Sequence, residues 1–160
     1  MLLILRPYFG ILTAALWSFI TLLSCVDATF LYRPEGWEET SRAYEWLLQN
    51  DDLELTTRGI TATSGSRSIV PEFDIRNLTD KQVILEKAEL FVKGVKSPLR
   101  STDVDRDLRL IQPGKNRNIP LYWQFDSQVL DILGQDPVIV LHFLMDTYQL
   151  RIEVSYCRVQ

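Results

Sequence analysis

His142, the single histidine of the chain, lies within the apolar stretch Val138–Leu144. A catalytic histidine needs a nucleophile and an orienting acid close to it in space. A short run with apolar residues on both sides of the histidine predicts a strand buried on both faces, which is a poor platform for chemistry that faces solvent. We therefore expect a hydrogen-bonded histidine in the core or on a sheet face, and a single histidine excludes a metal site built from several.

Three carboxylates at every second position, Asp103, Asp105 and Asp107, are the clearest candidate for metal binding. Calcium requires several oxygens around one point, and this spacing can begin the calcium-binding loop of an EF-hand. However, Leu108 occupies the position where that loop needs glycine, and Gly114 occupies the position where it needs a bidentate glutamate. An EF-hand is therefore excluded. The sequence predicts a solvated loop, with a looser calcium site between loops as the alternative.

Other patterns that would indicate catalysis are missing from the sequence. It contains no glycine-rich phosphate loop, no nucleophile elbow, no Cys-x-x-Cys pair and no His-Glu-x-x-His motif. Its two cysteines, Cys25 and Cys157, are too few for a disulfide scaffold or a four-ligand zinc site. We therefore predict a protein that is not an enzyme and that uses no cofactor or metal.

Asn77-Leu78-Thr79 is a formal N-glycosylation sequon. The modification would require passage through a eukaryotic secretory pathway. Asn77 and Asp80 are also typical of a turn between two strands, because their side chains hydrogen-bond the nearby backbone. We favour the structural interpretation of this motif.

The charge balance argues against two classes of partner. The net charge is −4 and the pI is about 5.0. A nucleic-acid-binding protein needs a basic face to neutralise phosphates, and electrostatic binding to anionic lipid needs a polybasic patch. The chain offers neither, so we expect no nucleic-acid partner, and any membrane association must come from an apolar segment or an attached lipid.

The N-terminal segment provides such an element. Residues 7–26 (PYFGILTAALWSFITLLSCV) contain no charged residue, and about twenty apolar residues span a bilayer as a helix. Arg6 precedes this run and Asp27 follows it, which points the remainder of the chain away from the cytoplasm. We therefore predict a retained single-pass helix within residues 1–28.

Two other interpretations of this segment remain open. Val26-Asp27-Ala28 has the small-residue pattern that a signal peptidase accepts, which would release a secreted, periplasmic protein beginning at Thr29. Leu22-Leu23-Ser24-Cys25 resembles the bacterial lipobox, and that resemblance implies that Cys25 carries a lipid and becomes the first mature residue. The uncharged run is longer than the ~7–15 residues of a signal-peptide core, which favours the retained helix. A disulfide between Cys25 and Cys157 is the least favoured role, because Cys25 lies at the membrane boundary.

Residues 29–52 are predicted to form a linker that contains one short amphipathic helix, Trp37–Gln49. Five side chains share one face at helical spacing, and these are Trp37, Ser41, Tyr44, Leu47 and Leu48. Trp46 points away from that face. We expect the apolar face to pack on the following domain, and Trp37, Tyr44 and Trp46 are the candidate residues for contact with a protein partner or the membrane surface.

Residues 53–160 show the period-two alternation of β-structure. The expected strands are 53–57, 60–63, 69–77, 83–92, 107–111, 119–125, 138–144 and 148–159. Pro120 indicates an edge strand or a bulge. Seven or eight short strands with regularly spaced turns predict a mainly β protein with an antiparallel sandwich. The pattern resembles an immunoglobulin-like β-sandwich of about seven strands, but it lacks the two core cysteines of antibody domains, so the resemblance implies architecture alone.

Together these features predict a membrane-anchored, extracytoplasmic β-sandwich that serves as an interaction or assembly subunit of an envelope complex. The absence of catalytic motifs and the N-terminal anchor support this hypothesis. The alternative is a secreted or lipid-tethered sandwich that binds or carries a small apolar or glycan ligand. A deep apolar pocket between the sheets would favour the carrier, whereas a filled core would not.

Overall fold

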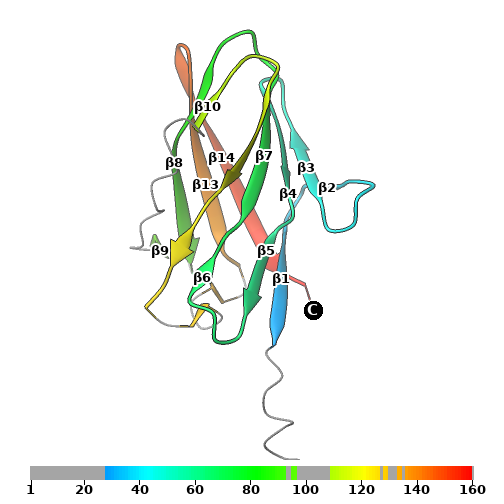
Figure 1. The fold of residues 1–160 in the computed structure, drawn as a ribbon, viewed down its shortest axis with the longest axis vertical. Coiled ribbons are helices and arrows are strands. Elements are labelled where there is room, and N and C mark those ends of the chain that lie inside the picture. Colours follow the sequence, from blue (N-terminus) through cyan, green and yellow to red (C-terminus); the bar gives the residue numbers. More distant parts are fainter. Residues whose placement is uncertain are drawn as a thin grey trace, which may run out of the picture.

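The computed structural model describes residues 28–92, 95–96, 109–126, 128–129, 133–134 and 136–159. Antiparallel strands dominate these residues and form two main sheets that pack face to face (Figure 1). The prediction of a mainly β, sandwich-like protein is confirmed. The predicted membrane or signal segment with Cys25 and the acidic stretch 103–107 lie outside the described residues. Within the described part of the chain, no helix has the length and apolar character needed to cross a bilayer.

The sheets differ in size. In spatial order the large sheet contains β10 (Leu110–Ile111), β8 (Val83–Val92), β13 (Val138–Met145), β14 (Tyr148–Arg158), β1 (Thr29–Pro34) and β5 (Ile60–Thr63), and β9 (Val95–Lys96) also pairs with β8. The small sheet contains β11 (Asn116–Pro120), β7 (Glu72–Asn77), β4 (Leu53–Thr57), β3 (Trp46–Gln49) and β2 (Glu38–Glu39). A separate pair joins β6 (Ser68–Ile69) to β12 (Trp123–Gln124).

Alternation along each strand builds the core between the sheets. In β13, Ile139, Leu141 and Phe143 are buried against the small sheet, whereas His142 faces outward. The largest fully buried side chains come from both sheets and from β12, and include Tyr32, Phe73, Trp123, Phe143 and Tyr156. Each fully buried apolar side chain of this size stabilises the fold by roughly 1.5–3 kcal/mol, so the shared core holds the two sheets together.

Residues 29–52 do not form the predicted linker and helix. β1 lies between β14 and β5 in the large sheet, and β2 and β3 form a hairpin at the edge of the small sheet. An isolated helix of thirteen residues is only marginally stable, whereas β3 extends an existing sheet and sets Trp46 opposite Thr57 on β4. The spacing of Trp37, Ser41, Tyr44, Leu47 and Leu48 therefore misled the helix prediction, and β1, the first described strand, begins at Thr29.

Most of the strands predicted after residue 52 are present. β4, β5, β8 and the β13–β14 hairpin around Asp146-Thr147 match their expected positions. Segments 69–77 and 119–125, each expected as one strand, are each divided into two strands. Pro71 and Pro120 lie at these divisions, and a proline cannot donate to a strand ladder. Pro120 ends β11, which is an edge strand of the small sheet. This agrees with the expectation that a proline within a strand indicates an edge or a bulge.

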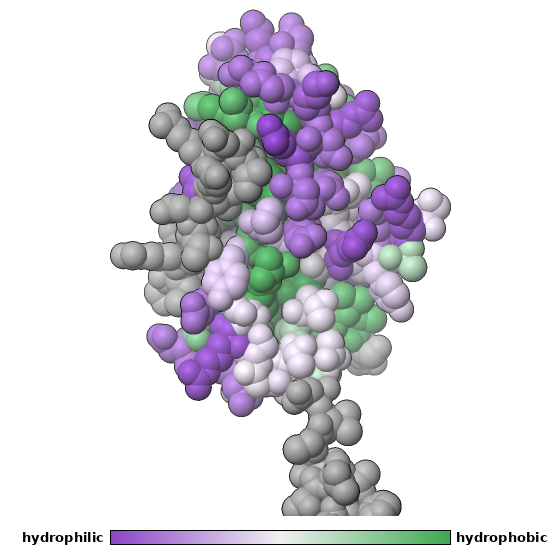
Figure 2. Space-filling model, in the orientation of Figure 1, coloured by the Kyte–Doolittle hydropathy of each residue, from purple (hydrophilic) through white to green (hydrophobic). Residues whose placement is uncertain are grey.

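The two ends of the sandwich differ in character. At one end the first and last described strands meet, because Val159 N–H donates to the Leu31 carbonyl at 2.8 Å, and the C-terminus lies beside the base of β1 (Figure 1). At the opposite end lie the turns at 50–52, 78–82, 112–115 and 146–147. Figure 2 shows hydrophilic side chains gathered at this opposite end. The chain thus enters the sandwich at one end and presents polar turns at the other.

Candidate functional site

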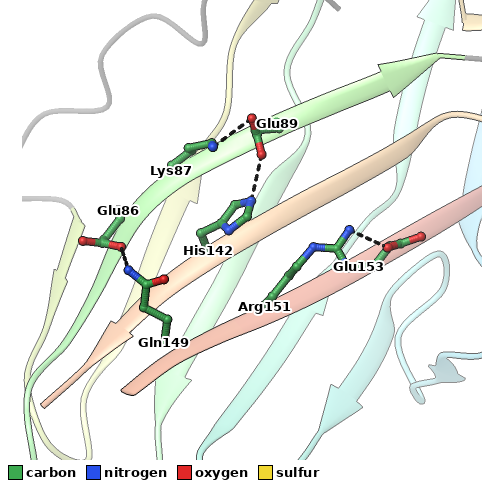
Figure 3. Close-up of polar contacts among 7 residues, drawn as sticks. All are labelled: Glu86, Lys87, Glu89, His142, Gln149, Arg151 and Glu153. Carbon is green, nitrogen blue, oxygen red and sulfur yellow. Dashed lines mark hydrogen bonds and ion pairs between the residues drawn. The ribbon is translucent and has the colours of Figure 1, made fainter. Parts of the chain in front are cut away.

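A group of polar side chains crosses the outer face of the large sheet, and we call it the sheet-face array. Its members are Glu86, Lys87 and Glu89 on β8, His142 on β13, and Gln149, Arg151 and Glu153 on β14 (Figure 3). Except for the consecutive pair Glu86 and Lys87, these residues lie at alternate positions of three neighbouring strands. Register brings them together, because His142 pairs with Lys87 on one side and with Arg151 on the other.

A β-bulge adjusts the array. The pairing of β13 with β8 passes from His142–Lys87 to Phe143–Leu85, so Glu86 is an extra residue without a partner on β13. Glu86 and Lys87 are consequently both exposed, although neighbouring strand residues normally face opposite sides. The bulge therefore adds one more charged residue to the outer face.

Glu89 is the centre of the array. Its carboxylate lies 2.9 Å from Lys87 Nζ and 2.8 Å from His142 Nε2. The Glu89 side chain is 11% exposed, compared with 27% for His142 and 52% for Lys87. A carboxylate with so little access to water needs such partners to keep its charge. The expectation of a hydrogen-bonded, sheet-face histidine is confirmed.

The β14 part of the array is more open to solvent. Arg151 Nη2 lies 2.8 Å from Glu153 Oε2, and these two side chains are 57% and 48% exposed. Gln149 Nε2 donates to Glu86 Oε2 at 3.2 Å and so links β14 to the bulge on β8. The array thus offers cationic, anionic and amide groups on one face of the sheet.

The array presents charged and hydrogen-bonding side chains on the outer face of the sheet. A glutamate that orients a histidine occurs in acid–base catalysis, but there the free imidazole nitrogen faces a nucleophile. No member of the array carries a hydroxyl or thiol. Among the described residues, no three His, Cys, Asp or Glu side chains converge to hold a metal ion. What the array can do chemically is present pre-organised hydrogen-bond and charge partners to another molecule.

The three aromatic residues predicted to contact a partner or the membrane have different environments. Trp46 is 6% exposed and belongs to the core, so that prediction is wrong for Trp46. Trp37 is half-buried and packs edge-on against Phe73, with ring centroids 6.4 Å apart. Tyr44 is 63% exposed on the loop between β2 and β3. Tyr44 alone of the three presents most of its ring to solvent.

Asn77, the sequon residue, is completely buried and joins the turn at 78–82 to β10. Its amide nitrogen donates to the carbonyls of Ile111 at 3.0 Å and Lys81 at 2.6 Å, and its amide oxygen accepts from the Thr79 N–H at 2.9 Å. An amide nitrogen held in this way cannot carry a glycan in the folded chain. The structural interpretation of the motif is therefore confirmed.

Cys157 is a free thiol on the outer face of β14 and is half-buried. Arg33 Nε donates to its sulfur at 3.4 Å across the β1–β14 pair. Cys25, the candidate lipid attachment residue, lies outside the described residues, so the relation between the two cysteines stays a prediction.

Two buried tyrosine hydroxyls lie in the core and differ in their partners. Tyr32 donates to the Gly134 carbonyl at 2.9 Å. The Tyr156 hydroxyl has no hydrogen bond of good geometry within the described structure, although Thr57 lies close enough to act on it. Burial strongly raises the pKa of the Tyr156 hydroxyl, an effect that Thr57 partly offsets. Burial likewise raises the pKa of Tyr32, against the opposing charge of Arg158.

The sequence analysis missed most of the array. It placed His142 on a strand but did not identify Glu89, Arg151 or Glu153 as its neighbours. A signal was present, since charged or amide residues recur at every second position in 149–153 of the last strand. Only the register between strands shows which of these residues lie side by side.

Comparisons with known proteins give no functional assignment. No protein-family model matches the chain. No curated protein sequence matches it. Among solved structures, the chain is similar to a functionally unknown protein from Listeria monocytogenes EGD-e, with a TM-score of 0.48 and 10% sequence identity over 81% of this chain and 87% of that chain.

Proposed function

We propose that this chain is a non-enzymatic interaction or assembly subunit of an envelope complex, held at a membrane with its sandwich outside the cytoplasm. The observation that carries the proposal is the sheet-face array. In it, Lys87 and His142 both contact the Glu89 carboxylate, and Arg151 and Glu153 are exposed. Fixed charges of both signs on a firm sheet give specificity to protein contacts.

The arrangement of the strands supports the proposed location. The uncharged segment of residues 7–26 directly precedes β1, and β1 begins at one end of the sandwich. A membrane helix, or a lipid on Cys25, would hold that end near the bilayer and direct the polar turns at the other end away from it. A fusion of a reporter active only in the cytoplasm, placed after Gln160, should be silent, and strong activity would contradict the location.

We also propose that the sandwich is immunoglobulin-like. Its support is the presence of two packed antiparallel sheets and the passage of the chain from one sheet to the other between β4 and β5. Immunoglobulin-like domains are common interaction modules, and in them loops and sheet faces carry recognition while the core supplies stability.

The carrier alternative has weaker support. The space between the sheets is occupied by one continuous cluster of side chains, with aromatic residues from both sheets at its centre. One feature favours the carrier, because the Tyr156 hydroxyl makes no well-formed hydrogen bond to a described residue, and a ligand between the sheets could provide one. Binding of a small apolar or glycan ligand is therefore retained as the second candidate.

Affinity purification of the full chain from solubilised membranes tests the proposed function. The double substitution Arg151→Glu with Glu153→Arg keeps the ion pair on β14 but inverts the charge pattern that a partner meets. We expect the natural chain to co-purify with one defined protein in constant ratio, and we expect the swapped chain to lose roughly tenfold in affinity while its melting temperature is unchanged. Purification of the natural chain alone would contradict the interaction function.

A further inference from the structure

The hairpin of β2 and β3 projects from the edge of the small sheet (Figure 1). The loop between these two strands carries Tyr44. Tyr44 is 63% exposed, the highest value for a large hydrophobic side chain among the described residues. Tyrosine is enriched at the energetic centres of protein interfaces, because it buries a large rigid ring and keeps a polar tip. Exposure of one such residue is common on surfaces, so the backbone beneath it decides whether the position is special.

Tyr44 has a φ of 59°, and it is the single non-glycine residue with positive φ in the part of the chain that the structure describes. Every other described residue with positive φ is a glycine. Hairpin loops favour Gly or Asn in this left-handed conformation, because a Cβ atom crowds the following carbonyl. The fold alone would therefore favour glycine at position 44. The Tyr44 ring is exposed, so core packing does not offset the cost of its left-handed backbone.

The loop holds Tyr44 in a fixed position. The Thr40 N–H donates to the Glu45 carbonyl at 2.9 Å, and the Thr40 hydroxyl donates to the Glu45 carboxylate at 2.9 Å. Arg42 forms an ion pair with the same carboxylate at 3.5 Å, and Glu45 is 9% exposed. Trp46 then anchors the hairpin in the core. A ring presented on a braced loop loses little conformational entropy on binding.

β2, the strand that leads into the loop of Tyr44, carries acidic side chains, and Arg42 in the loop is paired with Glu45. Glu35, Glu38 and Glu39 are exposed on and before β2 and form no ion pair with a described residue, although Glu35 and Glu39 lie within the field of Arg33. This charge disfavours anionic lipid headgroups. The hairpin also follows β1, whose six residues carry the chain roughly 20 Å from its start at Thr29. Both observations favour a protein over the membrane surface as the binding partner of the Tyr44 hairpin.

We propose that the β2–β3 hairpin is a docking site for a partner protein, with Tyr44 inserted into an apolar pocket that has a basic rim. The proposal rests on the proposed interaction function and names a second surface for it, on the small sheet and distinct from the sheet-face array. Tyrosine occupies a position that favours glycine because its ring serves binding and not folding.

The substitution Tyr44→Gly separates binding from folding. It removes the ring and relieves the left-handed backbone, so it should raise the melting temperature of the full-length chain. Tyr148, which is 47% exposed at the start of β14, is the matched control. A photo-crosslinking amino acid at position 44 of the full chain in native membranes should give one protein adduct that the same group at position 148 does not give.

The protein identified in that adduct is then purified, and its affinity is measured for the natural chain and the variants. We expect Tyr44→Gly to weaken binding at least tenfold in a more stable chain, Tyr44→Phe to weaken it less, and Tyr148→Ala to leave it unchanged. An adduct with lipid, identical adducts at positions 44 and 148, or unchanged affinity of Tyr44→Gly would overturn the docking site. If the double substitution Arg151→Glu with Glu153→Arg still weakens binding roughly tenfold in that case, the interaction function stands and only the hairpin is wrong.

Discussion

The carboxylate of Glu89 on β8 lies 2.8 Å from the imidazole of His142 on β13, although 53 residues separate them in the chain. This contact joins two neighbouring strands of the large sheet on their outer face. It also fixes the histidine ring next to Lys87, whose ammonium group shares the carboxylate. The contact therefore links polar side chains of β8 and β13 into one connected group on the sheet surface.

A double-mutant cycle measures that relationship. We expect Glu89→Gln and His142→Asn to show a coupling free energy of unfolding of about 1 kcal/mol, because the carboxylate is largely withdrawn from water. The exposed pair Glu86 and Gln149 is the control, and its coupling should stay below about 0.5 kcal/mol. Strictly additive effects at Glu89 and His142 in chemical denaturation would show that the contact does not organise the array.

Gly59 allows the chain to pass from the small sheet to the large one. Its φ is +78°, and a Cβ there would meet the carbonyl oxygen of Tyr32 on β1. We expect Gly59→Ala to lower the free energy of unfolding by about 3 kcal/mol or more, because β5 would be forced away from β1. Gly65→Ala is the control, since Gly65 has a similar φ of +84° in open space, and it should cost about 1 kcal/mol. Equal losses in urea titrations would contradict the close-approach argument.

Asn77 holds the polar end of the sandwich together. Replacement by alanine removes the amide donor to the Ile111 and Lys81 carbonyls and leaves Lys81 with the Thr79 hydroxyl as its side-chain donor, and we expect a loss of about 2–4 kcal/mol in the free energy of unfolding. Asn118→Ala removes one exposed hydrogen bond to Asp74 and should change stability by less than about 0.5 kcal/mol. A small effect at Asn77 in thermal denaturation would show that the turns are held by other contacts.

Tyr156→Phe tests the unpaired hydroxyl in the core. We expect the substitution to leave stability unchanged or to raise it by up to about 1 kcal/mol, because no well-formed hydrogen bond is lost. Tyr32→Phe, which removes the bond to the Gly134 carbonyl, should instead cost about 1 kcal/mol. A clear loss of stability in Tyr156→Phe at neutral pH would mean that the hydroxyl has a partner in solution.

The effect of Tyr156→Phe on stability should depend on pH, because burial raises the pKa of the Tyr156 hydroxyl in the folded chain. The pKa of Tyr156 is raised in the folded state, so its contribution to stability is complete below the ordinary tyrosine pKa of 10.0 and is lost as the pH rises above it. Stability measured between pH 9 and pH 11 should therefore fall more steeply in the natural chain than in Tyr156→Phe. Parallel curves would contradict the assignment of a raised pKa to this residue.

Period-two alternation was sufficient to predict much of the β-structure. The strands around Leu55, Ile60 and Leu90 and the hairpin at Asp146-Thr147 follow from local patterns that agree with their burial. The segment Trp37–Gln49 was predicted wrongly as a helix, because Trp37, Ser41, Tyr44 and Leu47 follow one another at intervals of four, three and three residues. A hairpin of two short strands and a loop can carry the same spacing. The turn-forming pair Thr40-Ser41 inside the segment was the signal against a helix.

The candidate site was less predictable, because it depends on register. The alternation within β8, β13 and β14 shows which side chains share a face, but a shift of one residue would have placed His142 in the core. The bulge at Glu86 changes the pairing within β8 and cannot be identified from one sequence. The exposure of Tyr44 and the burial of Trp46 likewise depend on the hairpin, which was not predicted.

The mass of the full-length chain as extracted from membranes tests the central claim of an interaction subunit most directly. Native mass spectrometry after mild detergent release reports both the N-terminal processing and any bound species. We predict the 18.6 kDa chain with its retained N-terminal segment in a complex with a second protein. A mature chain that begins at an acylated Cys25 would replace the membrane helix by a lipid anchor and leave the interaction function intact. A chain that carries only a small molecule of a few hundred daltons, and no second protein, would contradict the account and favour the carrier.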